Sequence, residues 1–265
     1  RTPPKPPAAV RGVCETPTRG NAQALGATRV RGDKDDSVNF AVFSSSATAV
    51  SLVLWTPEAL AKGEITAEIE LDDRVNKTGS VWHVALPKCA ENVLYGYRVD
   101  GPYEPEKGHR FDRSKVLLDP CAKATVSRPR YGELGKKADG SEDCWPQYAG
   151  AVPKKNKKDD REDFDWQGVT SPNRPMSDLV VYEAHVRGMT ADLKTKAQPG
   201  TYAALVETLP YLKTLGVNAI ELMPCHEFNE LEYHSVNPAT GEFRRNFWGY
   251  STVNFFSPMT RYAEA

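Results

Sequence analysis

The chain has 265 residues, of which 40% are hydrophobic and 26% charged, and its formal net charge is −1. A balanced charge gives no general attraction to nucleic acid or to an anionic membrane surface. No apolar run reaches the roughly 18 residues that a membrane-spanning helix requires. The length allows two ordinary domains. We therefore expect a soluble globular protein that binds neither nucleic acid nor membrane, and a neutral ligand fits this composition.

The cysteines are five in number and lie far apart: Cys14, Cys89, Cys121, Cys144 and Cys225. No two of them have the short spacing of a metal-binding pair. An odd number of scattered cysteines favours reduced thiols over a disulfide framework. We expect the chain to need no cofactor.

The first 24 residues are rich in proline, arginine and alanine and show no periodicity. The opening stretch, residues 1–7, is polar and lacks the hydrophobic centre of a secretory signal. We expect residues 1–24 to be a disordered leader, of the kind that remains after a transit peptide is removed.

Residues 25–125 alternate between apolar and polar side chains, as strands with one wet face do. The alternation predicts five short strands, with turn residues between them: 38–43, 50–55, 64–71, 81–86 and 93–99. Short strands at this spacing are typical of a β-sandwich of about 100 residues. We therefore predict a sandwich over 25–125.

Residues 126–178 hold turns and charges but little periodicity, which predicts a linker. The charged run at 154–161 is interpreted as a solvated loop, with a binding patch as the alternative. From Leu179 the pattern changes, and the apolar run 179–182 is typical of a strand buried on both faces. A helix and a second buried strand at 217–224 follow. Strand, helix and strand together predict one βαβ unit with parallel strands.

The helix of this unit is expected to follow Pro199 and Gly200 and to stop at Gly216. Its apolar side chains fall on one face: Tyr202, Leu205, Val206, Leu209, Leu212 and Leu215. Pro210 lies inside it, where proline costs about 3 kcal/mol unless the helix bends or breaks. We expect a kink or a restart near Leu209.

Several motifs in this part resemble a known family. The stretch 181–190 resembles the first barrel strand of the alpha-amylase family of glycoside hydrolases. Residues 216–224 resemble its second strand, and 246–258 resemble the loop that follows. Upstream, 94–102 resembles the end of the sandwich that precedes many branch-handling members, a carbohydrate-binding module associated with starch and glycogen.

Three further stretches, 76–84, 225–233 and 255–258, are similar to isoamylases of plants and green algae. The motifs occur in the family's order over residues 25–265, and this order is more specific than any one motif. The chain thus resembles the front portion of a plastid isoamylase, a starch-debranching glycoside hydrolase. Pro210 and the lysine-rich insert at 154–158 depart from the family's pattern.

The resemblance implies a fold in which the sandwich is followed by the first strands and helix of a (β/α)₈ barrel over 179–265. It also implies a retaining mechanism with two carboxyl groups about 5–5.5 Å apart. In the family these carboxyl groups follow barrel strands four, five and seven. A whole barrel takes about 250 residues, which is far more than residues 179–265 provide. We therefore expect an incomplete barrel, no catalytic residue in this chain, and no activity from this segment alone.

Two aromatic residues are candidates for binding substrate. Tyr250 matches the family's tyrosine that stacks under the sugar ring at the cleaved bond, and the alternative is that it packs the loop. Trp248 has the same two interpretations, of which packing is favoured. The functional interpretation of both rings rests on the resemblance. It is also physically reasonable, because an aromatic face suits the C–H surface of glucose.

His185 and Arg187 lie at the end of the first predicted barrel strand. They are substrate-subsite candidates. The favoured alternative is that both are buried and satisfied by neighbours such as Glu183 or Glu221.

Two other groups of residues invite a functional interpretation. Trp55, at a strand end, is a candidate glucan-stacking platform, whereas Trp82, Tyr95 and Tyr97 are expected in the core. The acidic and histidine side chains of 226–234 lack the spacing of a zinc motif. Resemblance to bacterial isoamylases leaves open a calcium site near Glu227, but we expect no metal.

The resemblance implies hydrolysis of α-1,6 branch linkages in amylopectin or glycogen by the full-length protein. Two alternatives stay open: a non-catalytic glucan-binding isoamylase subunit, and a glucan branching transferase. The expected partner is an α-glucan, with homo- or hetero-oligomers of isoamylase-type subunits as a further expectation. The expected location is the chloroplast stroma.

Overall fold

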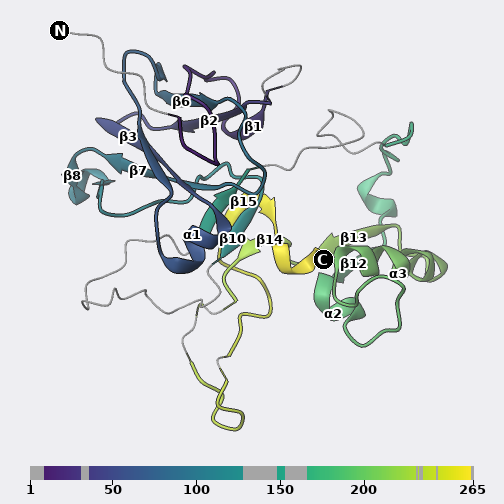
Figure 1. Cartoon of the computed structure of the whole chain (residues 1–265). Helices are drawn as coiled ribbons and strands as arrows, with labels where there is room; N and C mark the ends of the chain where they lie inside the picture. The colour runs from purple at the N-terminus through teal and green to yellow at the C-terminus, as the bar shows by residue number, and fades with distance from the viewer. Residues whose placement is uncertain are drawn as a thin grey trace. The chain divides into compact units, whose positions relative to one another are not determined.

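The computed structural model describes residues 9–30, 36–127, 148–152, 166–230, 232, 235–242 and 244–263. The chain divides into two compact units, Arg1–Lys155 and Asn156–Ala265, which are treated separately below (Figure 1). In the part of the chain that the structure describes, no helix has both the length and the apolar character to cross a membrane.

The first unit contains two antiparallel sheets, which confirm the predicted β-sandwich. One has the order β1-β2-β6-β5, formed by Gly26–Arg29, Val38–Phe43, Val81–Leu86 and Lys77–Thr78. The other has the order β10-β11-β7-β3-β4, formed by Thr125–Ser127, Tyr148–Ala151, Leu94–Asp100, Ala49–Trp55 and Ala67–Glu70. A short hairpin, β8 (Tyr103–Glu104) and β9 (His109–Arg110), encloses the 3₁₀ turn η1 (Pro105–Lys107).

The core of the sandwich is shared by side chains from both sheets. Phe40 of β2 meets Tyr95 of β7 edge to face, with ring centroids 5.0 Å apart. The Tyr95 hydroxyl donates to Oδ2 of Asp119 at 2.9 Å, which satisfies a polar group that would otherwise be buried at a cost. Trp82, Tyr95 and Tyr97 are all buried, as predicted.

Trp55 is also fully buried, with 0% of its surface exposed, so the predicted glucan platform is wrong. Leu54 faces the sandwich core, and Trp55 therefore faces the opposite side of β3. That side is covered by a second apolar cluster, which includes Leu60 of the helix α1 (Pro57–Lys62) and Val116. The indole fills this cluster and presents no face to a sugar.

Replacing Trp55 by alanine should lower the free energy of unfolding by about 3–5 kcal/mol, because it leaves a cavity among closely packed side chains. Urea denaturation of the full chain would measure this cost. A loss of glucan affinity without a loss of stability would instead restore the platform interpretation.

The sandwich extends beyond both predicted boundaries. Val13 and Cys14, within the predicted disordered leader, are buried in its core, and Thr18 pairs with Ala85 of β6. Strand β11 comes from the predicted linker. The prediction of a disordered leader is therefore wrong for residues 9–24, which pack against the sandwich. Residues 1–8 and the lysine-rich insert at 154–158 lie outside the described residues.

The cysteines that the structure describes, Cys14, Cys89, Cys121 and Cys225, are free thiols, as predicted; Cys144 lies outside the described residues. Burial raises the pKa of Cys89 to about 12, which keeps this thiol protonated at neutral pH.

The second unit contains the predicted βαβ unit. Strands β12 (Val181–Ala184) and β13 (Ala219–Leu222) are parallel, with the helix α3 (Tyr202–Thr214) between them in sequence. The short helix α2 (Val186–Thr190) follows β12 directly. The prediction that the first strand is buried on both faces is wrong, because Val181 is 52% exposed. The sheet has only two strands in the described residues, which leaves side chains of both strands uncovered.

Helix α3 begins at the cap Thr201, whose hydroxyl accepts from the Ala204 amide at 3.2 Å. It runs to Thr214 through Pro210 without the predicted restart. Pro210 is exposed, as is Val206 one turn earlier, so water can satisfy the carbonyl that lacks a partner. The predicted apolar face is only half correct: Leu205 and Leu212 are buried, but Val206, Leu209 and Leu215 are exposed.

The second unit ends in an antiparallel pair, β14 (His226–Phe228) and β15 (Thr252–Pro258). Two 3₁₀ turns complete it, η2 (Met176–Asp178) before β12 and η3 (Thr260–Tyr262) after β15. Val186, Leu205, Phe228, Met259 and Tyr262 form its apolar cluster. This cluster joins α2, α3, β14 and η3 around the residues of the candidate site.

Candidate functional site

The loop that leads into β15 is fixed by the side chain of Asn246. Its Oδ1 accepts from the Gly249 amide at 3.2 Å, and its Nδ2 donates to the Tyr250 carbonyl at 2.8 Å. Nδ2 also donates to Oε2 of Glu232 at 3.2 Å. The main-chain amide of Asn246 donates to the Glu230 carbonyl at 2.7 Å. Asn246 therefore fixes the backbone that carries Tyr250 and also connects it to Glu230 and Glu232.

Gly249 is required by the shape of this loop. Its φ of +81° lies in the left-handed region that favours glycine. A Cβ atom at this position would lie 2.9 Å from Cε1 of Phe228 and 3.0 Å from the Pro224 carbonyl oxygen. The close approach seats the loop directly on β14.

Replacing Gly249 by alanine should destabilise the second unit by about 1–3 kcal/mol, from backbone strain and from the two close contacts. A lower urea midpoint of the full chain would show it. The matched change Gly241→Ala keeps the same backbone region, with φ +72°, but its Cβ would meet nothing within 4 Å. Equal losses in the two variants would contradict a role for the contacts with Phe228 and Pro224.

Tyr250 and Trp248 both project their rings outward from this loop, with 60% and 58% of their surface exposed. Trp248 contacts only the edge of Phe247 among the aromatic contacts of the described residues, with centroids 5.9 Å apart. Packing was the favoured interpretation of Trp248, but most of its ring is open. Substrate contact by either ring stays a prediction.

His185 joins the end of β12 to this loop. Its Nδ1 accepts from the Gly188 amide at 2.9 Å, which caps α2. Its Nε2–H donates to the Phe247 carbonyl at 2.7 Å, and the imidazole stacks on the Phe247 ring with centroids 4.3 Å apart. These bonds indicate the neutral Nε2–H tautomer. His185 is buried and satisfied, but by the backbone and not by Glu183 or Glu221.

Arg187 belongs to a cluster of charges around the buried carboxylate of Glu230. Nη1 of Arg187 lies 2.7 Å from Oε1 of Glu230, and its guanidinium also lies over the ring of Tyr262 at 5.1 Å. The other oxygen, Oε2, lies 3.1 Å from Nε of Arg261 and 3.7 Å from Nη1 of Arg245. Arg187 therefore compensates a buried charge, and its partner is not Glu183 or Glu221.

Glu227 on β14 is buried beside this cluster. Its Oε2 accepts from the amide and hydroxyl of Thr260 at 2.9 and 3.0 Å, and Oε1 lies 3.7 Å from Arg261. Within the residues that the structure describes, no group of three or more histidine, cysteine or acidic residues could hold a metal. The guanidinium of Arg261 lies beside the carboxylates of both Glu227 and Glu230.

Two phenols, of the partly buried Tyr202 and the buried Tyr262, connect the same elements. The Tyr202 hydroxyl donates to the Cys225 carbonyl at 2.6 Å and accepts from the Met259 amide at 3.1 Å. Burial raises the pKa of Tyr262 to about 12, with Arg187 lowering it and Glu230 raising it. Both phenols stay neutral at physiological pH and act as fixed hydrogen-bonding groups.

The structural roles of Asn246 and Glu230 were not predicted from the sequence. An asparagine three residues before a glycine signals a side chain that holds a turn, and this signal was available at 246–249. Glu230 was considered only as a metal ligand. Its pairing with Arg187 spans 43 residues of sequence, and no local pattern reports such a contact.

The chain is similar to known proteins in both of its units. Residues 24–122 match the family described as carbohydrate-binding module 48 (isoamylase N-terminal domain). The chain is 50% identical over 233 residues to the chloroplastic isoamylase 1 of Arabidopsis thaliana, a match that covers 88% of this chain and 29% of that protein. The chain resembles an isoamylase N-terminal region. It is also 38% identical to the glycogen debranching enzyme of Dickeya chrysanthemi over 82% of this chain and 31% of that protein.

Solved structures show the same fold. The pullulanase SAP of Group B Streptococcus aligns with a TM-score of 0.65 at 22% identity, over 92% of this chain and 30% of that chain. The pullulanase of Paenibacillus barengoltzii aligns with a TM-score of 0.58 at 18% identity, over 92% of this chain and 33% of that chain. The chain thus shares with these structures a β-sandwich module that is followed by a second unit with a parallel βαβ arrangement. It spans about 30% of the length of the isoamylases that it matches.

Proposed function

We propose that the whole protein that carries this chain hydrolyses α-1,6 branch linkages in a starch-type or glycogen-type glucan. The observation that carries the proposal is the exposed ring of Tyr250, held on a loop whose backbone is fixed by Asn246 and Gly249. The similarity to isoamylases and to a glycogen debranching enzyme supports the reaction class.

The proposed role of Tyr250 is to bind a glucose ring at the cleaved linkage. A rigid aromatic ring buries a large area against a sugar at little cost in conformational freedom. Because its backbone is already ordered, little entropy is lost when substrate binds. Trp248 on the same loop is proposed to contact an adjacent part of the glucan. His185 and Arg187 are proposed to act indirectly, by holding Phe247 and Glu230 below this loop.

The catalytic carboxylates are proposed to lie outside this chain, in a barrel that this chain only begins. A retaining mechanism needs one carboxylate free to attack the anomeric carbon and a second that gives a proton to the leaving oxygen. The carboxylates of Glu227 and Glu230 are engaged by Arg187, Arg261 and Thr260 instead. The 265-residue chain alone is expected to release no reducing ends from amylopectin.

The test uses the whole protein with amylopectin and follows reducing ends together with iodine staining. New reducing ends with bluer staining are expected, because debranching frees linear chains. Paler staining without new reducing ends would overturn the proposal in favour of a branching transferase. No change in either signal would favour a non-catalytic glucan-binding subunit.

We further propose an α-glucan as the partner and the plastid stroma as the location, supported by the chloroplastic isoamylases that this chain resembles. Assembly with like or related isoamylase-type subunits is proposed on the same ground. Sedimentation of the whole protein, alone and with the related subunits, would test the assembly.

A further inference from the structure

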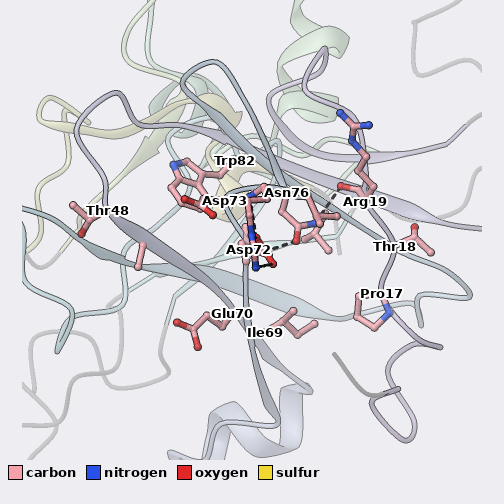
Figure 2. Close-up of a pocket in the computed structure, with 15 residues that line it drawn as sticks. Pro17, Thr18, Arg19, Thr48, Ile69, Glu70, Asp72, Asp73, Asn76 and Trp82 are labelled. Atoms are coloured by element: carbon pink, nitrogen blue, oxygen red, sulfur yellow. Dashed lines mark hydrogen bonds and ion pairs between the residues drawn. The ribbon is translucent and has the colours of Figure 1, made fainter. Parts of the chain in front are cut away.

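Residues 13–21 form a strap that is hydrogen-bonded to the sandwich. Thr18 exchanges two main-chain hydrogen bonds with Ala85 of β6, at 2.8 and 3.1 Å. The Arg19 carbonyl accepts from Nδ2 of Asn76 at 3.3 Å. Figure 2 shows this bond as a dashed line, beside a cavity of about 600 Å³ that Thr18 and Arg19 help to line. The second half of the strap is therefore fixed to the sandwich.

The first half of the strap pairs with the segment that follows β6. The Val13 carbonyl accepts from the Ala90 amide at 2.8 Å, and the Glu15 amide donates to the Pro87 carbonyl at 3.0 Å. Cys14 lies between these two bonds, and its own amide and carbonyl bond to residue 10 instead. Cys14 thus occupies a non-hydrogen-bonded position opposite residues 87–90.

The facing segment carries one extra residue at this position. Lys88 and Cys89 both fall between the two flanking bonds, and Lys88 has a φ of +50°, in the left-handed region. This is the arrangement found in a β-bulge, which re-aims the side chains beside it. Nζ of Lys88 lies 2.6 Å from Oε1 of Glu15, and both of these side chains are exposed. Cys89 is left to face the core.

Cys14 and Cys89 face each other on the core side of this pairing. Both belong to the apolar core of the sandwich, with 8% and 3% of their surface exposed. Burial raises the pKa of Cys89, and the charge of a Cys14 thiolate raises it further, which requires the two sulfur atoms to be near each other. Facing residues at a non-hydrogen-bonded position have Cα atoms about 4.5 Å apart, and disulfides bridge Cα atoms about 4.4–6.8 Å apart.

We propose that Cys14 and Cys89 form a reversible disulfide that locks the strap onto the sandwich. The structure shows the reduced state, with two free thiols. The oxidant is a small-molecule disulfide of the glutathione type. The Cys14 thiolate attacks one of its sulfur atoms and releases one thiolate. The Cys89 thiolate then attacks Sγ of Cys14 and releases the second. Two protein thiols are oxidised, one external disulfide is reduced, and the two protons pass to the released thiolates.

The buried position of the pair sets how this exchange proceeds. Burial raises the pKa of both thiols, so little of the attacking thiolate is present at neutral pH and the exchange is slow. Cys14 is the more exposed of the two and lies on the strap, whose first half can open locally by breaking a few main-chain bonds. Cys14 therefore reacts first. Once formed, the disulfide closes a long loop of the sandwich and opposes this opening.

The test incubates the natively folded 265-residue chain with oxidised glutathione. The variant Cys121→Ala/Cys144→Ala/Cys225→Ala retains Cys14 and Cys89 as its only cysteines. We expect its mass to fall by about 2 Da, the Cys14 and Cys89 peptides to be joined after digestion, and dithiothreitol to reverse both changes. The melting temperature should rise by about 5–10 °C on oxidation. Peptide mapping of the wild-type chain should find the same linkage.

The matched control adds Cys89→Ala to the triple variant. It should stop at a mixed disulfide between Cys14 and glutathione, without a rise in melting temperature. Three results would overturn the inference. One is a stable mixed disulfide at Cys14 in the chain that retains Cys89, because Cys89 would then be out of reach. Another is a linkage that forms only in urea. The third is a linkage between two chains in place of one within the chain.

Discussion

Replacing Tyr250 by alanine in the whole protein lowers kcat/KM for amylopectin by about 100-fold, if its ring positions the sugar at the cleaved bond. The stacking contact contributes about 0.5–1.5 kcal/mol beyond the area that it buries. A misplaced reacting bond can cost a further factor, up to about 100-fold in rate. Tyr250→Phe keeps the ring and should remain within about tenfold of the wild type. Initial rates of reducing-end release measure both variants.

The chain offers a matched control for this change. Tyr211 on α3 has the same 60% exposure as Tyr250 but lies on a helix away from the loop of Asn246. Tyr211→Ala should leave kcat/KM unchanged. An equal loss of activity in the two alanine variants would mean that exposed tyrosines act through stability or solubility, and the substrate role of Tyr250 would be abandoned.

Replacing Glu230 by alanine should lower the free energy of unfolding by about 2–3 kcal/mol, below the cost for a fully buried pair. Glu230 is buried and balances the positive charges of Arg187 and Arg261, and removal of one partner of a buried ion pair leaves uncompensated charge behind. Both arginines are partly exposed, so water will recover some of the lost interaction. Urea denaturation of the full chain measures the change.

The matched control is Glu242→Ala, because Glu242 is exposed and its carboxylate forms no ion pair among the described residues. Its removal should change stability by less than about 0.5 kcal/mol. Glu230→Gln separates charge from shape, since the amide retains an acceptor for Arg187. A stability of Glu230→Ala equal to that of the wild type would contradict a structural role for the charge cluster.

Much of the sandwich was predictable because its strands have one wet face. The alternation at 38–43 and 81–86 predicted β2 and β6 with their observed bounds. The stretch 64–71 also alternates, but only Ala67–Glu70 forms a strand, since α1 ends at Gly63 and the chain turns before pairing with β3. Period two therefore located this strand but did not fix its ends.

The helix α1 was missed although its signals were present. Thr56 caps it, Pro57 occupies its first turn and Gly63 ends it in the left-handed region. Recognition of this helix would have corrected Trp55, because the helix covers the face of β3 to which the indole belongs. The error at Trp55 thus began with a missed local element and ended as a wrong functional prediction.

The aromatic loop of Tyr250 was predictable from the sequence, but the contacts that hold it were not. The residues at 246–251 indicated an aromatic loop, and the structure exposes Tyr250 and Trp248 there. Glu183 or Glu221 was predicted to satisfy His185, and that prediction was wrong. The imidazole binds the Phe247 carbonyl, 62 residues away in the sequence.

The sequence by itself determined the strand alternation and the elements of the βαβ unit, because these depend on residues within short segments. It also determined the family resemblance, because that depends on several short motifs in a fixed order along the chain. Only the tertiary structure decided which face of β3 buries Trp55 and which arginines compensate Glu230. Those features depend on groups brought together across tens of residues. Burial and charge compensation are properties of the packed chain, whereas periodicity is a property of the local sequence.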